Sequence, residues 1–190
     1  MNGYDWRWKI SEVVERLRTR YIYVGRKHGA PFLAVVYEPE AQSAVFVEWA
    51  NQKKALAPDI DVRTVDILAV TQGVVDNFGA ANVVEAMKNP MPGSDAALEL
   101  SSLWIDAISK AVKCAFNDST SSKPVVSLER LAALYPPIGP RHLMQSLWDS
   151  PDEVVGGPVI VLIPGTLTGE PRTYDFLGLK KEIMYRGDLL

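Results

Sequence analysis

Three short, mainly apolar runs lie along this chain. They occupy residues 32–37, 125–128 and 159–163, and each is bounded by Gly, Pro or Glu. Runs of this length that are rich in Val and Ile are typical of strands buried on both faces of a parallel sheet. Residues 60–65 are predicted to form one more strand. The last run is expected to stop at once at Pro164-Gly165-Thr166.

The segments between these runs carry apolar residues at helical spacing. Residues 5–20 place five of them on one side of an amphipathic helix: Trp6, Ile10, Val13, Val14 and Leu17. Further helices are predicted over residues 39–56, 67–78, 80–88, 96–116 and 141–148. Asp66 is a candidate N-cap for the helix that begins at Ile67, and Ser94 or Asp95 for the helix that begins at Ala96. The inner face of that long helix is expected to carry Leu98, Leu100, Leu103, Trp104, Ile108, Val112 and Phe116.

Strands that alternate with helices predict βαβ units with right-handed crossovers. The expected fold class is therefore α/β. We expect a three-layer domain with a mostly parallel central sheet and a P-loop-NTPase-like topology without a Walker A motif. The whole chain, residues 1–190, is expected to form one domain, with the helix over residues 5–20 packed on it or extending from it.

The turn after the first strand stands where a P-loop would bind nucleotide. Its sequence, Glu38-Pro39-Glu40-Ala41-Gln42-Ser43, has no glycine and no lysine, and its two carboxylates would repel phosphate. Ligands of parallel sheets nevertheless gather at the carboxyl ends of the strands. The alternative hypothesis is thus a degenerate or cryptic nucleotide- or metal-binding enzyme that uses Glu38, Glu40, Asp66 and Thr166.

Composition narrows the function classes. Apolar residues make up 47% and charged residues 23% of the chain, which is ordinary for a soluble globular protein. The net charge of −3 gives no electrostatic reason to expect direct nucleic-acid binding. A single cysteine favours a reducing compartment, and no apolar run approaches the roughly 20 residues that span a bilayer. The expected location is the cytoplasm, away from membranes.

Few residues offer chemistry. Cys114 is expected on the buried side of its helix, as inert core, and His28 on a solvated loop. His142 has no Cys, Asp or Glu at ligand spacing. Asp59, Asp61 and Asp66 could hold a divalent ion, but flanking and capping roles are favoured. The sequence therefore predicts no catalytic residue, no metal ligand and no cofactor.

The remaining candidates concern partners. Trp6 and Trp8 lie two apart on one helix, so they cannot both face one core, and exposed Trp beside Arg suits a protein interface. A basic stretch could contact nucleic acid: Arg16, Arg18, Arg20, Arg26, Lys27 and His28. The interleaved Glu12 and Glu15 and the acidic total favour a solvated helix face instead.

Residues 125–190 contain several elements in a recognisable order. The apolar run at 125–128 is followed by Leu134-Tyr135-Pro136 and by a helix that begins Arg141-His142-Leu143. A strand and turn at 157–166 then read Gly-Pro-Val-Ile-Val-Leu-Ile-Pro-Gly-Thr. An aromatic-Leu-Gly segment and a terminal Tyr185-Arg186 complete the order. In these elements the chain resembles the BrxB family of BREX bacteriophage-exclusion systems. It departs from the family pattern at residues 128–130 and 185–188, which indicates a divergent member.

The resemblance implies a small non-catalytic component of an antiviral defence system, partnered with PglZ, an alkaline-phosphatase-like protein. From residues and resemblance together we expect a protein-binding subunit that docks a PglZ-like partner. Whether the chain also forms a homodimer is left open. The candidate partner contacts are Trp6, Trp8, Tyr135, Arg141, Tyr185 and Arg186.

Overall fold

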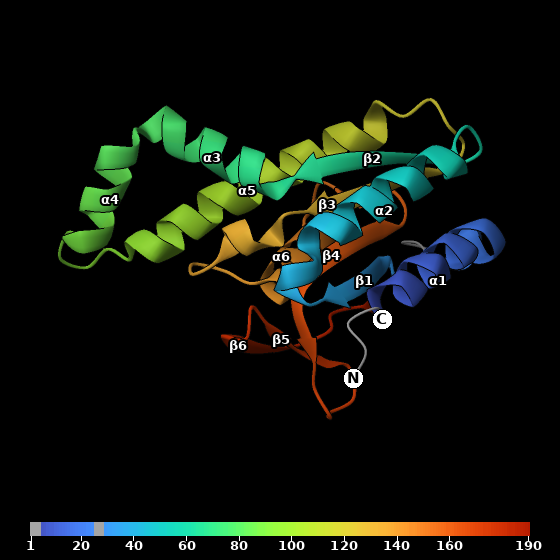
Figure 1. Cartoon of the computed structure of the whole chain (residues 1–190). Helices are drawn as coiled ribbons and strands as arrows, with labels where there is room; N and C mark the ends of the chain where they lie inside the picture. Colours follow the sequence, from blue (N-terminus) through green and yellow to red (C-terminus); the bar gives the residue numbers. More distant parts are fainter. Residues whose placement is uncertain (1–4, 25–28) are drawn as a thin grey trace.

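A parallel sheet forms the centre of the molecule (Figure 1). The structure, a computed structural model, describes residues 5–24 and 29–190. Five parallel strands lie in the order β2-β3-β4-β1-β7. Their bounds are Phe32–Tyr37 (β1), Asp61–Asp66 (β2), Pro124–Glu129 (β3), Val159–Leu167 (β4) and Gly187–Leu189 (β7). All four predicted strands are confirmed, β2 with a shift of one residue.

Helices cover both faces of the sheet and complete three layers. The helices are α1 (Asp5–Arg20), α2 (Gln42–Leu56), α3 (Ile67–Phe78), α4 (Ala80–Lys88), α5 (Ala96–Asn117) and α6 (Pro140–Asp149). Short 3-10 turns precede α2, as η3 (Pro39–Ala41), and α6, as η4 (Leu131–Leu134). The prediction of a three-layer α/β fold is confirmed.

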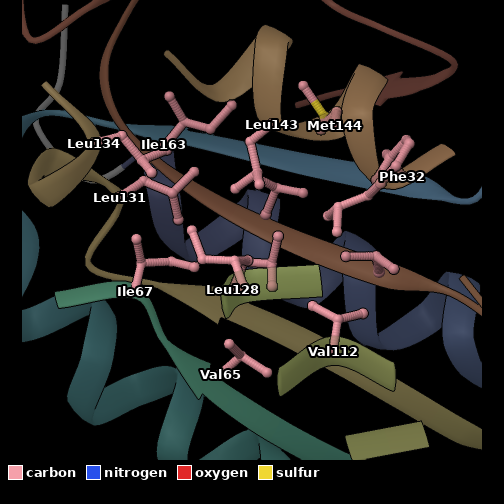
Figure 2. Packing of buried hydrophobic residues seen from close by; sticks show 14 of the residues in the cluster. Phe32, Val65, Ile67, Val112, Leu128, Leu131, Leu134, Leu143, Met144 and Ile163 are labelled. Carbon is pink, nitrogen blue, oxygen red and sulfur yellow. The ribbon is translucent and has the colours of Figure 1, made fainter. Parts of the chain in front are cut away.

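Two hydrophobic clusters lie on opposite faces of the sheet. Leu33, Val35 and Tyr37 of β1 face α1 and α2, while the alternate positions face the other cluster. Successive side chains of a strand point to opposite faces, so β1 needs apolar residues throughout. Figure 2 shows the second cluster, where residues of η4, α5 and α6 pack against the strands. Helix α1 packs on the first face through Ile10, Val13 and Leu17 and does not extend away from it.

The helix caps follow the local chemistry of the sequence. Asp66 Oδ1 accepts a hydrogen bond from Ala69 N at 3.2 Å and caps α3. Asp95 Oδ1 accepts one from Leu98 N at 3.0 Å and caps α5. A side-chain acceptor at an N-cap satisfies one of the orphan N–H groups of the first turn. Both capping predictions are therefore confirmed, with Asp95 rather than Ser94 in the second case.

The expected end of β4 at Pro164 is wrong. The strand continues to Leu167, and residues 165–167 pair antiparallel with β5 (Thr173–Phe176), which pairs with β6 (Lys180–Ile183). Gly165 permits this pairing, because a Cβ atom there would lie 2.2 Å from Asp175 O. Only a residue without a side chain lets the two backbones approach so closely.

Three side chains of α5 do not face the core as expected. Leu98 is 59% exposed, because the first turn of α5 lies clear of the sheet (Figure 1). Leu103 is 37% exposed, because it lies one position, about 100° around the helix, from the buried Trp104. Cys114 is also exposed. It follows the buried Val112 by two positions, which is about 200° around a helix of 3.6 residues per turn. Cys114 is therefore not part of the core.

Candidate interaction site

The carboxyl end of β3 carries a polar network. Glu129 Oε1 accepts from Lys53 Nζ at 2.8 Å, Thr64 Oγ1 at 3.1 Å and Ser127 Oγ at 3.1 Å. Ser127 Oγ in turn accepts from Trp49 Nε1 at 2.8 Å. Side chains of α2, β2 and β3 thus satisfy one another at the edge of the sheet where ligands of α/β folds gather. Sequence reasoning missed Glu129 and Lys53, since 76 residues separate them.

Asp66, at the end of β2, is also used structurally. One carboxylate oxygen caps α3, and the other lies 3.0 Å from Arg130 Nη1. Arg130 follows β3 directly and adopts a left-handed conformation with φ 61°. The ion pair therefore joins the ends of two neighbouring strands.

The four residues of the alternative hypothesis are not brought together. Glu38, Glu40 and Thr166 are exposed. Within residues 5–24 and 29–190, no hydrogen bond or ion pair joins any two of Glu38, Glu40, Asp66 and Thr166. In the same ranges, His, Cys, Asp and Glu side chains form no group of three that could hold a metal ion.

The other acidic and basic candidates have ordinary surroundings. Asp61 Oδ2 accepts from Arg63 Nε at 2.7 Å and from Ser119 Oγ at 2.8 Å, in the flanking role favoured above. His142 is exposed on α6. Arg26, Lys27 and His28 lie outside the described residues.

Three tyrosines are held in their neutral form. Burial raises the pKa of Tyr21 to about 12. Burial, with the Glu129 carboxylate nearby, raises the pKa of Tyr37, and burial with Glu182 raises that of Tyr174. In each case a phenolate would lose hydration that the protein interior does not replace.

We therefore expect the free energy of unfolding to fall in alkali. A tyrosine in the unfolded chain ionises near its usual pKa of 10.0, while the folded chain retains the proton. The stabilisation is complete below pH 10 and declines as the pH rises toward 12. Urea denaturation between about pH 8 and pH 11 measures it. The Tyr21→Phe variant should show a shallower decline, and an equal decline in both proteins would contradict the assignment.

Of the predicted partner contacts, the structure buries one tryptophan. Trp6 is 6% exposed and belongs to the cluster beneath α1, whereas Trp8 is 59% exposed. The prediction that only one of the pair faces the core is confirmed. Trp6 is thus not available as a partner contact, because its indole packs against the sheet face.

The other four candidates lie around α6. Tyr135 is 42% exposed just before the helix, and Arg141 lines a pocket of about 450 Å³ at the start of the helix, together with Lys180 and Lys181. Tyr185 Oη donates to Asp149 Oδ1 at 3.2 Å, and the Arg186 guanidinium lies 5.1 Å from the centre of the Trp148 ring. Trp8, on α1, belongs to the opposite face of the sheet.

A segment with several exposed apolar side chains was not predicted from the sequence. We call residues 76–99, from the end of α3 through α4 to the first turn of α5, the helical arm. Figure 1 shows α4 and the adjoining ends of α3 and α5 clear of the sheet. Helix α4, which the structure describes completely, has no buried residue. The exposed large apolar side chains of the arm are Phe78 (52%), Val84 (50%), Met87 (39%), Met91 (76%) and Leu98 (59%).

The arm bends sharply at Gly79, which adopts φ 81°. Helices α3 and α4 meet there at 86°. In the described part of the chain, no single helix has the length and apolar character to cross a membrane, although α3 and α4 meet those criteria as a bent pair.

No family model, no curated protein and no solved structure matches this chain. The resemblance to the BrxB family therefore stays a prediction from the residues quoted for it.

Proposed function

We propose that this chain is a non-catalytic, protein-binding subunit and that the helical arm is its main docking surface. The observation that carries the proposal is α4, a nine-residue helix with no buried residue. Isolated helices shorter than about 12–15 residues are marginal in water, and most helices in proteins are stabilised by burying an apolar face. Five large apolar side chains of the arm are exposed, and apolar side chains gathered on an exposed segment mark an interaction site.

The carboxyl end of the sheet supports the same proposal. At the ends of β2 and β3 the charged groups are engaged with one another, Lys53 with Glu129 and Arg130 with Asp66. A ligand that needed them would first have to break these ion pairs.

The resemblance to the BrxB family supports a role in a BREX-like antiphage defence complex in the cytoplasm. The proposed partner is then a PglZ-like protein. Trp8, Tyr135, Arg141, Tyr185 and Arg186 are proposed as further contacts, since these five are accessible outside the arm.

Co-purification with the products of neighbouring genes tests the proposal. The Phe78→Ser and Met91→Ser substitutions, made together, are expected to weaken the complex at least tenfold, because truncating buried anchors of an interface costs more than about 1 kcal/mol each. The free energy of unfolding should change by less than about 1 kcal/mol, since both side chains are exposed.

Val47→Ser is the matched control. Val47 is 64% exposed, but it lies on α2, across the sheet from α3 and α5. Its complex should elute like that of the parent chain. Equal elution of the arm variant and the control, or no complex with any neighbouring product, would refute the proposal.

A further inference from the structure

We infer that the helical arm binds an amphipathic helix of a different protein, one whose apolar stripe is flanked by Lys or Arg. The inference rests on the proposed function and adds the chemistry of the partner. Two features of the arm carry it, the kind of apolar side chains that it exposes and its net negative charge.

The apolar side chains suit a helical ligand. They come from both sides of the bend at Gly79, with Phe78 ending α3, Val84 and Met87 on α4, and Leu98 in the first turn of α5. Every element of the arm is helix or turn, so it offers no strand edge for β-pairing. Recognition of an amphipathic helix relies instead on apolar anchors, and unbranched Met side chains adapt readily to such anchors.

Charge is distributed unevenly between the arm and the rest of the chain. The arm contains four acidic residues, Asp76, Glu85, Asp95 and Glu99, and one basic residue, Lys88. All five are exposed. Outside the arm, the chain's 20 Lys and Arg and 23 Asp and Glu reduce to nineteen of each. The whole net charge of −3 therefore resides in the arm.

The net negative charge of the arm discriminates between possible binding partners. A second copy of the chain would bring three net negative charges against three others, and like charges across an interface oppose association. Anionic lipid surfaces would repel the arm for the same reason. A helix with Lys or Arg beside its apolar stripe fits both features of the arm, because it would bury the exposed apolar side chains and pair with the exposed carboxylates of the same segment.

Two synthetic peptides test the inference with the full chain. Both carry Leu at i, i+3, i+4 and i+7 spacing, one with Lys and the other with Glu at the flanking positions. We expect the Lys peptide to bind at least tenfold more tightly by fluorescence anisotropy. Raising the salt concentration from about 50 to about 300 mM should weaken that binding severalfold, because the flanking charges are solvent-exposed.

Variants of the chain locate the binding. Phe78→Ser with Met91→Ser should abolish it, Glu85→Lys with Glu99→Lys should reverse the preference between the peptides, and Val47→Ser should change nothing. Circular dichroism confirms that each variant is folded.

Several results would overturn the inference. The first is that the two peptides bind equally well or not at all. The second is that the free chain sediments as a dimer that the arm substitutions dissociate. The third is that the chain binds vesicles of phosphatidylcholine and phosphatidylglycerol. A natural complex that is lost in the apolar variant but kept in the charge-reversed variant would refute the partner chemistry. That result would leave the proposed function intact.

Discussion

Replacing Glu182 by alanine is expected to destabilise the fold by about 2–4 kcal/mol, because a buried carboxylate with several hydrogen bonds is lost. The Glu182 side chain is 4% exposed. Its Oε2 accepts from Arg141 N and from Tyr174 Oη, both at 2.9 Å, and its Oε1 lies 3.1 Å from Lys180 Nζ. Gly139, the N-cap of α6, has no side chain of its own to cap the helix. Glu182 supplies that cap from β6, where the helix dipole favours a negative charge.

Urea denaturation of the Glu182→Ala and Glu182→Gln variants measures this contribution. Glutamine keeps the shape and one acceptor oxygen, so Glu182→Gln should lose roughly half as much stability as alanine. Loss of less than about 0.5 kcal/mol in Glu182→Ala, the range of ordinary surface substitutions, would contradict the capping role.

Truncating Trp49 is expected to cost about 3–5 kcal/mol, the usual range for Trp to Ala in a core. Trp49 is 1% exposed and fills the space between α2 and the sheet. Its Nε1 also donates to Ser127 Oγ, which is 2.8 Å away and contacts Glu129. Trp49→Ala therefore leaves both a cavity and an incomplete polar network.

Trp8→Ala is the matched control for Trp49→Ala. Trp8 is 59% exposed on α1, so its removal should change the free energy of unfolding by about 0.5 kcal/mol or less. Comparable losses in the two variants, measured by thermal and urea unfolding, would show that the assigned packing of α1 and α2 is wrong.

The order of helices and strands could be predicted because it depends on local patterns. The β1 segment is apolar throughout, β3 is apolar at Val125, Val126 and Leu128, and both stop at Glu. Asp66 and Asp95 stand directly before helical periodicity. Such signals act over a few residues. The extension of β4 could not be predicted in this way. It depends on the close approach of Asp175 to Gly165, a contact between strands that only the folded chain reveals.

The site was less predictable than the fold. Helical spacing alone separated Trp6 from Trp8, because two residues on one helix point in different directions. The exposure of the helical arm could not be predicted, because the apolar pattern of a helix is the same whether the helix packs on its own core or binds a partner. Leu98 illustrates the ambiguity: its periodicity assigned it to the core, yet it is 59% exposed.

The central claim is that the helical arm is the docking surface. Hydrogen exchange, recorded for the free chain and for its complex with the neighbouring gene product, tests this claim most directly. Exposed helical amides with few tertiary contacts open readily, so residues 80–88 should exchange fast in the free chain. In the complex, protection should appear in residues 76–99. Protection confined to other segments, with the arm exchanging as fast as before, would contradict the account.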